Sequence, residues 1–307
     1  MLVYLNGSLV PHEKAVVSVF DRGFLFGDGV YEGLRSSRGV VIGLERHVAR
    51  MRDGLQEARI RGFAPASLGP LTDQLLGANK LSDAFIYWQV TRGAPPGDEG
   101  PARARTIRGS LAPTVLGFAT PVAAVADCRT PEVRRVSLRP DTRWTRGHLK
   151  STSLLGGVLA AFEADEAGAD DAIMVRDGVV TEGTATNVFA VIKGRVVTPS
   201  LESAPMLSGV TRAMILDADP SVEQRPITVE ELKAAEEIML VGTKTMVAGV
   251  ASLDGRPVGK PGSAPGPKTR EMLSALVRTI NTEVDRKLAA RSRSGGAAIG
   301  EVGAARA

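Results

Sequence analysis

Lys150 is a candidate nucleophile because of its place in the chain. It occurs in the sequence Gly-His-Leu-Lys-Ser at residues 147–151, directly before an apolar helical segment that runs to Phe162. An amine held in a partly dry pocket has a lowered pKa and becomes nucleophilic, as a lysine that forms a Schiff base must be. A solvated lysine near the start of a helix gives the same pattern. Lys150 alone therefore identifies no site.

Two later segments carry groups that suit a bound anion or an acid–base role. Glu182 stands in a run of small hydroxyl and amide side chains, residues 181–189, which ends in an apolar strand. At residues 207–212, Leu-Ser-Gly-Val-Thr-Arg, Ser208 could begin a helix whose free amide groups and Thr211 hydroxyl suit a phosphate dianion. Each segment has an ordinary alternative, a polar turn for the first and a plain helix N-cap for the second.

Arg50, much earlier in the chain than these segments, could also bind an anion. It lies in an amphipathic helix predicted over residues 44–60, beside the segment 20–35. By itself it is typical of a solvated helix face. Other nucleophile and phosphate motifs are missing from the sequence: there is no Gly-x-Ser-x-Gly, no Walker loop and no helix-opening Gly-x-Gly-x-x-Gly, and Cys128 has no neighbouring histidine.

Taken together, these segments resemble the class IV aminotransferases, the pyridoxal-phosphate enzymes of fold type IV. The resemblance runs from about Leu2 to Arg278. Residues 21–32, Asp-Arg-Gly-Phe-Leu-Phe-Gly-Asp-Gly-Val-Tyr-Glu, match the family's N-terminal signature. The other matching segments are Lys150-Ser151 with Leu154-Leu155-Gly156, Glu182-Gly183 with Asn187-Val188-Phe189, and Gly209-Val210-Thr211-Arg212. Each match is moderately specific, but four in the family's order leave little room for coincidence.

The resemblance implies how these residues would act on pyridoxal 5'-phosphate. Lys150 would form the Schiff base and then move the proton between substrate and cofactor. Glu182 would pair with the pyridine nitrogen and keep it protonated, so that the ring accepts electrons. Arg50 would hold the phosphate together with Val210 and Thr211.

The same resemblance assigns four more residues to the site. Leu207 would pack on one face of the ring, and Asn187 would contact the cofactor from the glutamate segment. Tyr31 would be a second catalytic residue, with its hydroxyl near Lys150 or the phosphate. Thr243 lies where the family has further phosphate or substrate contacts.

Within the family, residues 86–93 and 141–144 resemble the D-amino-acid transaminases. The usual members carry an Arg-x-His in the following loop that grips the substrate carboxylate, whereas residues 96–99 here read Pro-Gly-Asp-Glu. A carboxylate in a closed site needs a cationic partner. The candidates are Arg35, Lys244, Arg92 and the loop arginines Arg103, Arg105 and Arg108. We expect a D-amino-acid transaminase, acting on a substrate such as D-alanine or D-glutamate with a 2-oxo acid, whose carboxylate site uses Arg35 or Lys244.

Other reactions on the same fold stay open. Gly33 and Arg35 resemble a branched-chain aminotransferase pattern, and the missing carboxylate clamp suits an (R)-selective amine transaminase. Aminodeoxychorismate lyase shares fold and cofactor but eliminates pyruvate. A binding protein without activity is disfavoured because both Lys150 and Glu182 are present. The resemblance also implies a homodimer with the site at the domain junction.

The predicted strands and helices that position these residues follow an α+β pattern with two lobes. In the first part of the chain we predict strands at residues 2–5, 8–10, 29–35, 40–42, 85–91 and 114–119, and helices at 44–60 and 68–76. In the second part of the chain we predict strands at residues 133–138, 172–176, 188–192 and 237–241, and helices at 153–167, 208–217 and 267–288. We predict an N-terminal α/β domain at residues 1–120, a cofactor-binding domain at 121–288, a disordered tail at 289–307, and a long surface loop at 93–109.

Composition excludes several other classes. The chain has 307 residues, enough for two domains, and its 43% hydrophobic content suits a packed core. The net charge of residues 286–307 equals the +4 of the whole chain, so the rest is near neutral, and only 4% of residues are aromatic; both observations disfavour nucleic-acid binding. The apolar runs are short of the roughly 18 residues that a membrane helix needs, and no signal peptide is evident, so we expect a cytoplasmic protein. One cysteine and three scattered histidines predict neither disulfide nor metal site.

Overall fold

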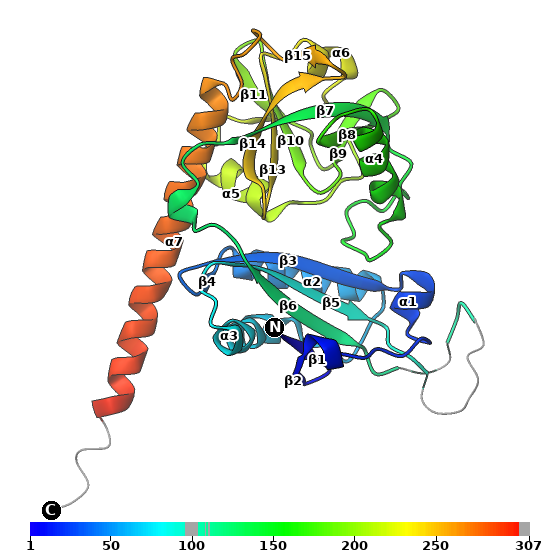
Figure 1. The fold of residues 1–307 in the computed structure, drawn as a ribbon, viewed down its shortest axis with the longest axis vertical. Helices are drawn as coiled ribbons and strands as arrows, with labels where there is room; N and C mark the ends of the chain where they lie inside the picture. The colour runs from blue at the N-terminus through cyan, green and yellow to red at the C-terminus, as the bar shows by residue number, and fades with distance from the viewer. Residues whose placement is uncertain (96–103, 108, 110, 301–307) are drawn as a thin grey trace, which may run out of the picture.

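Two β-sheets with their own helices form the two lobes of the molecule (Figure 1). The computed structural model describes residues 1–95, 104–107, 109 and 111–300, with side chains up to Arg293. The first sheet ends at Pro121 and the second begins at Glu132. This arrangement confirms the predicted α+β class.

The N-terminal sheet is antiparallel throughout, with the strand order β2-β1-β6-β5-β3-β4. Its strands are β1 (Leu2–Leu5), β2 (Ser8–Pro11), β3 (Gly29–Ser37), β4 (Val40–Val41), β5 (Ala84–Thr91) and β6 (Val115–Pro121). Asn6 and Gly7 join β1 to β2 with φ angles of 48° and 98°, as the predicted hairpin turn requires. The helices of this lobe are α1 (Arg22–Phe26), α2 (Leu44–Glu57) and α3 (Leu68–Asn79).

Alternation along β3 and β5 decides which side chains face the helices and which face the second lobe. Leu34 and Trp88 are fully buried in the core that α2 and α3 complete. The indole Nε1 of Trp88 donates to Thr72 Oγ1 of α3 at 2.8 Å, so this large side chain is both packed and satisfied. Tyr31 and Phe85 occupy alternate positions on these strands and line a cavity on the other face of the sheet.

The C-terminal sheet is mixed, with the order β12-β11-β10-β13-β14-β7-β8-β9 and β15 beside β14. Its strands are β7 (Glu132–Pro140), β8 (Asp171–Arg176), β9 (Val179–Gly183), β10 (Asn187–Ile192), β11 (Arg195–Thr198), β12 (Glu223–Gln224), β13 (Glu237–Gly242), β14 (Met246–Leu253) and β15 (Arg256–Pro257). Its helices are α4 (Leu155–Glu166), α5 (Val210–Ala218), α6 (Val229–Lys233) and α7 (Pro267–Gly300). Every residue of β10 is buried, because hydrophobic clusters cover both faces of the sheet. This explains its continuous apolar sequence.

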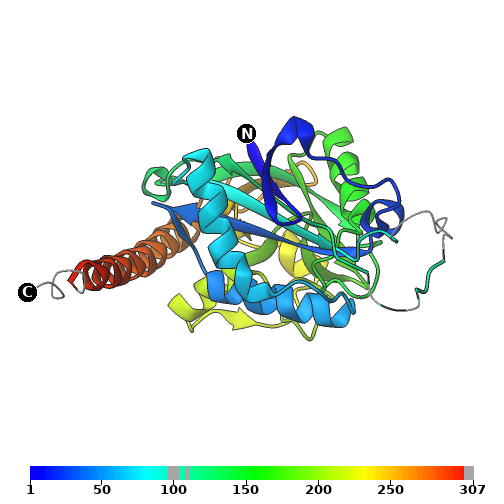
Figure 2. The same cartoon turned by 90° about the horizontal axis from the view of Figure 1, so that it is seen from below.

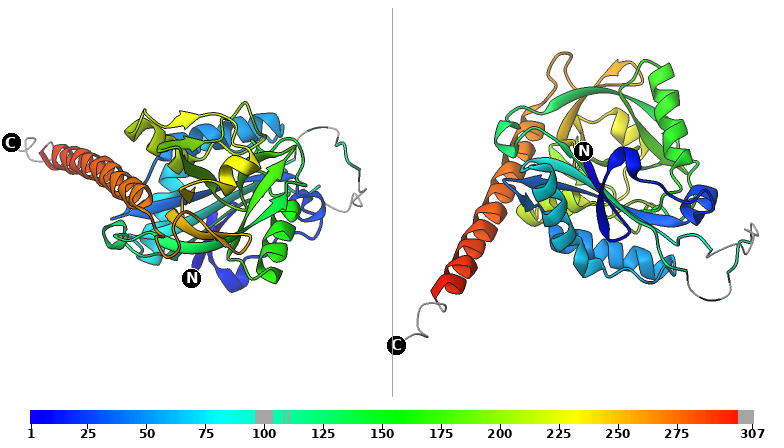
Figure 3. Two further views of the ribbon diagram at one scale, coloured as in Figure 1. Left: turned by 90° about the horizontal axis from the view of Figure 1, so that it is seen from above. Right: turned by 60° about the horizontal axis from the view of Figure 1, so that its bottom comes forward.

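Helix α7 fixes the two lobes relative to each other. Its N-terminal half packs against α5, β13 and β14, and its later turns run alongside the N-terminal lobe (Figure 1). Glu283 accepts hydrogen bonds from the amide of Gly43, which precedes α2, at 3.0 and 3.3 Å. Arg291 reaches Asp73 of α3 at 3.0 Å. Figures 2 and 3 show that the last turns of α7 project beyond both lobes.

The predicted disorder from Ala289 differs from the structure, in which α7 continues to Gly300. Alanine and arginine are strong helix formers, and adding residues to an existing helix costs far less than nucleating one. The contacts of Arg291 with the N-terminal lobe hold one turn of this extension. Residues 301–307 lie outside the described part of the chain. None of the described helices is long and apolar enough to span a membrane.

Candidate functional site

A cavity of about 330 Å³ lies between the two sheets, and we call it the site cavity. Of the residues that the sequence singled out, ten line it: Tyr31, Arg50, Lys150, Glu182, Asn187, Leu207, Val210, Thr211, Thr243 and Lys244. The fold therefore brings together residues that are up to 213 positions apart (31 to 244). Arg143, Trp144 and Thr186 also line the cavity and were not singled out as site residues.

The segment that carries Lys150 is held by the strand of the other lobe. The amide of Tyr31 in β3 donates to the Lys150 carbonyl at 3.0 Å, and Val30 forms an antiparallel bridge with Ser151. The amide of Thr152 donates to the Gly29 carbonyl at 3.0 Å. The Lys150 side chain is half-buried, and its Nζ lies 4.2 Å from the centre of the Tyr31 ring. A strand-like backbone thus presents the amine to the cavity beside an aromatic face.

Glu182, near the end of β9, is a buried carboxylate with three donors around it. Its Oε1 accepts from Arg143 Nη1 at 2.5 Å, and its Oε2 accepts from the Leu207 amide at 3.1 Å and from Asn187 Nδ2 at 3.4 Å. Burial raises the pKa of Glu182, although the charge of Arg143 opposes the rise. Arg143 is held in turn by both oxygens of Asp141 at 2.9 Å.

Arg143 is a site residue that sequence reasoning missed. The signal is the Asp-Thr-Arg-Trp sequence at residues 141–144, which resembles the D-amino-acid transaminases but indicates no contact with Glu182. The sequence alone does not show this contact, because Arg143 reaches Glu182 from a different segment of the lobe. That pairing joins residues 39 positions apart and has no local pattern.

One end of the site cavity gathers groups that could hold an anion. Helix α5 begins here after Gly209, with no side chain capping its first amide groups, and the hydroxyls of Thr211 and Thr243 line the same cavity. Arg50 reaches this helix end by donating from Nη1 to the Ser208 carbonyl at 3.0 Å. The backbone is packed so closely that a Cβ on Gly209 would come within 1.9 Å of Asn187 Oδ1. A helix N-terminus with an arginine and two hydroxyls is a donor set that fits a phosphate.

Of the carboxylate-binding candidates outside the loop, Lys244 alone lines the site cavity. It lies in the turn between β13 and β14, and among the described residues it forms no ion pair with a carboxylate. Arg35 is buried outside the cavity lining, where Nη1 donates to the Lys244 carbonyl at 3.1 Å and Nη2 to the Ala123 carbonyl at 2.6 Å. Its guanidinium therefore braces the turn that carries Lys244.

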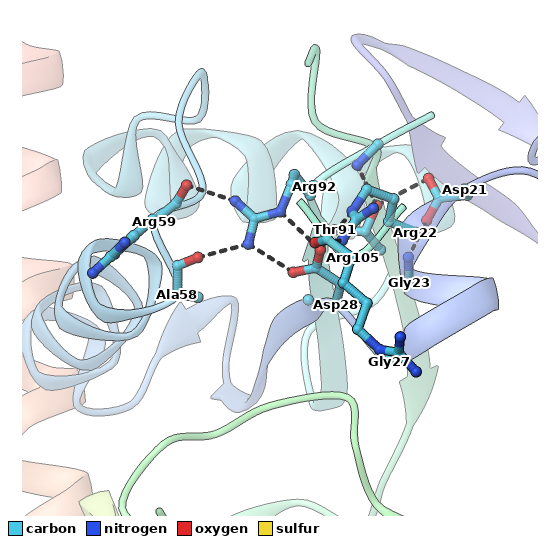
Figure 4. A network of polar contacts seen from close by, with 12 residues as sticks. Asp21, Arg22, Gly23, Gly27, Asp28, Ala58, Arg59, Thr91, Arg92 and Arg105 are labelled. Atoms are coloured by element: carbon cyan, nitrogen blue, oxygen red, sulfur yellow. Dashed lines mark hydrogen bonds and ion pairs between the residues drawn. The ribbon is translucent and has the colours of Figure 1, made fainter. Parts of the chain in front are cut away.

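Arg92 is also committed elsewhere (Figure 4). Its Nε and Nη2 donate to the two oxygens of Asp28 at 2.7 and 2.8 Å, and Nη1 and Nη2 also donate to the carbonyls of Arg59 and Ala58 at 2.7 Å each. The same carboxylate accepts from Arg22 Nε at 2.7 Å. The structure thus places Arg92 in a network outside the cavity lining.

The loop predicted over residues 93–109 is described only in part. Arg105 is exposed, and its carbonyl accepts from Arg22 Nη2 at 3.0 Å. Arg103, Arg108 and the acidic stretch at residues 96–99 lie outside the described residues. Within the part of the chain that is described, no group of three or more His, Cys, Asp or Glu side chains could hold a metal ion.

Comparison of the chain with known proteins identifies the family that it matches. Residues 29–253 match the family described as Amino-transferase class IV. D-alanine aminotransferase from Bacillus licheniformis is 34% identical over 288 residues, which cover 92% of this chain and 98% of that protein. The D-alanine aminotransferase of Staphylococcus haemolyticus is 32% identical over 285 residues, covering 91% and 98%. The solved branched-chain aminotransferase of Thermoproteus uzoniensis with norvaline superposes with a TM-score of 0.80 at 27% identity, covering 92% of this chain and 96% of that one.

Proposed function

Because this chain belongs to the class IV aminotransferase family, we propose that it transfers the amino group of a D-amino acid to a 2-oxo acid with pyridoxal 5'-phosphate in the site cavity. The observation that carries this proposal is the joint placement of a lysine amine, a buried carboxylate and an anion-binding helix end around one cavity. A phosphorylated pyridine aldehyde needs these three groups. The D-alanine aminotransferases among its relatives support the choice of substrate.

The residues divide the work according to their chemistry. Arg50, Val210, Thr211 and Thr243 would hold the phosphate through the helix end and their donors. When bound, the cofactor supplies an electron sink for the substrate carbon that loses its proton. The other assigned groups then act at the ring and at that carbon.

At the ring, Glu182 would accept a hydrogen bond from the pyridine nitrogen, and its orientation is fixed by the Leu207 amide and by Asn187. Leu207 would pack on one ring face. The Lys150 amine would bind the cofactor and carry the proton to and from the substrate carbon. The Tyr31 ring, whose centre lies 4.2 Å from Lys150 Nζ, would help to hold this amine in place.

The proposal is tested by following half-reactions through the absorbance of the loaded enzyme. D-alanine and D-glutamate should convert the enzyme to its aminated form much faster than their L-enantiomers do. Branched-chain transamination is the second candidate, favoured by the structural match to the Thermoproteus uzoniensis enzyme, and faster turnover of L-leucine would establish it. Turnover of (R)-1-phenylethylamine, or pyruvate release with no 2-oxo acid present, would indicate amine transamination or a lyase.

Lys244 is the cation that would bind the substrate carboxylate. Of the lining cations, Arg50 would hold the phosphate, and Arg143 is paired with Asp141 and Glu182. Lys150 is reserved for the cofactor. A carboxylate entering the cavity would therefore find its charge partner at Lys244.

Lys244→Ala should raise KM for D-alanine by about 10- to 100-fold, the effect expected from losing a charge-assisted hydrogen bond. Its kcat should change much less, and turnover of an amine without a carboxylate should not change. Lys260→Ala, at an exposed loop position, is the matched control. An unchanged KM for D-alanine in Lys244→Ala would reject this assignment.

The homodimer would form through the outer face of α4. Leu155, Val158, Leu159 and Phe162 recur at helical spacing on this face, with 69%, 43%, 48% and 62% of their surfaces exposed. The inner face of α4 carries Ala160 and packs on the sheet. Such an apolar patch suits a second copy of this chain, and it adjoins the site cavity through Leu154 and Trp144.

Phe162→Asp should therefore shift the protein from dimer to monomer in sedimentation velocity, with the dissociation constant raised about 100-fold or more. Glu166→Ala, an exposed position in the last turn of the same helix, should leave the dimer intact. A Phe162→Asp protein that sediments like the unmodified chain would place the contact elsewhere.

A further inference from the structure

Glu32, His47 and Arg50 form a polar cluster beside the site cavity, which Arg50 lines. Glu32, on β3, has a fully buried side chain, and it accepts hydrogen bonds from Arg50 Nε and Nη2 at 2.7 Å each. His47, one turn before Arg50 on α2, places Nδ1 2.7 Å from Glu32 Oε2, and 1% of its side chain is exposed. Neither Glu32 nor His47 lines the site cavity.

The geometry leaves two donors of the arginine for a ligand. A guanidinium has five N–H donors in a rigid plane. Glu32 takes the edge formed by Nε and Nη2, and the Ser208 carbonyl takes one donor of Nη1. One hydrogen on Nη1 and one on Nη2 remain for a ligand. Since Arg50 lines the cavity at the start of α5, these donors are available to an anion there.

The groups around Glu32 favour its ionised form. Burial by itself would raise the pKa of Glu32, but the charges of Arg50 and His47 outweigh it and lower the pKa to about 2. Burial lowers the pKa of His47, against the opposing pull of Glu32. Since a carboxylate oxygen accepts, His47 donates from Nδ1 and so holds the carboxylate oxygen that Arg50 Nη2 also contacts.

From this juxtaposition we infer that Glu32, oriented by His47, is a positioning residue that holds Arg50 ready for the phosphate of the cofactor. A long side chain loses rotamer freedom when it binds a ligand, and this cost falls if the side chain is already fixed. The bidentate pair on a fully buried carboxylate fixes both the plane and the direction of the guanidinium. This inference rests on the proposed function, because it takes the ligand of Arg50 to be the cofactor phosphate.

The test compares binding of pyridoxal 5'-phosphate with binding of pyridoxal, which lacks the phosphate, to the cofactor-free protein by fluorescence quenching. Glu32→Gln keeps the shape of the side chain but removes its charge. We expect its Kd for the phosphorylated compound to rise at least about tenfold while its Kd for pyridoxal stays the same. Arg50→Ala gives the reference for complete loss of phosphate selectivity. Glu230→Gln, at an exposed position of α6, should change neither constant.

A second variant and the unmodified protein make every outcome decisive. His47→Gln keeps the Arg50 pair but removes the Nδ1 donor, so it should give a smaller loss of the same phosphate-specific kind, and it stands in if Glu32→Gln fails to fold. Unchanged phosphate selectivity in the folded variants would overturn the positioning role, as would an equal loss for both compounds, which a purely structural role predicts. If the unmodified protein shows no preference for the phosphorylated compound, the proposed function itself fails.

Discussion

Lys150→Ala is expected to lower kcat for transamination at least about 1,000-fold. The variant loses the amine that would bind the cofactor and the base that would move the substrate proton, and each contribution alone is worth about 100-fold or more. The fold should survive, because β3 holds this segment through the backbone of residues 150–152 rather than through the lysine side chain. Single-turnover absorbance with D-alanine measures the loss.

Chemical labelling gives this prediction a readout that does not depend on turnover. Borohydride reduction of the loaded enzyme should fix the cofactor on the peptide that contains Lys150, and Lys150→Ala should carry no label. Lys244→Ala is the matched control, since it removes another lysine that lines the cavity and should still be labelled at Lys150. Label on any other lysine of the unmodified enzyme would refute the assignment.

The sequence was informative about the site wherever a group must sit in a particular local structure. Lys150 before an apolar helix, Glu182 before an apolar strand and Thr211 at a helix start each depend on neighbours in the chain. The structure brings all three around one cavity. Their order in the sequence resembled a family, and that resemblance supplied the long-range proximity that local patterns lack.

Charge pairing between distant segments could not be predicted in the same way. Arg35, Arg92 and Lys244 were equivalent as isolated cations, yet the structure commits the first to backbone carbonyls and the second to Asp28. Glu32 lay within the recognised N-terminal signature, but its partner Arg50 is 18 residues away on a helix. A buried ion pair is decided by tertiary packing, which side-chain type and spacing do not encode.

The strands of the C-terminal lobe show the same limit for the fold. The prediction omitted five strands of this lobe, β9, β11, β12, β14 and β15, although β14 (Met246–Leu253) is apolar along most of its length. A strand buried on both faces has no alternation to distinguish it from a buried helix segment. In the N-terminal lobe, where β5 alternates between a helix-covered face and the cavity, the prediction was close to the observed bounds.

Glu182→Gln is expected to lower kcat about 100- to 1,000-fold with little change in KM, because it removes a charge that acts on the reacting system and not on substrate binding. The isosteric amide keeps the shape of the site, and Arg143 stays bound to both oxygens of Asp141. The amide nitrogen must face one of the three donors around Glu182, so the unfolding temperature of the cofactor-free protein should also fall, while the protein stays folded. Glu230→Gln, at an exposed position of α6, is the control for an amide in place of a carboxylate.

The direction of the effect on the pyridine nitrogen separates this role from a loss of packing. A carboxylate beside the nitrogen stabilises the protonated ring, so removing the charge should lower the pKa of that nitrogen. Nitrogen NMR of isotopically labelled cofactor should then show the proton leaving at a lower pH in Glu182→Gln than in the unmodified enzyme. Burial already raises the pKa of Glu182, and Arg143 works against that rise. Arg143 thus favours the charged form of Glu182, so Arg143→Met should lower the pKa of the ring nitrogen, as Glu182→Gln does. If the ring nitrogen titrates identically in the unmodified enzyme and in both variants, Glu182 does not contact it.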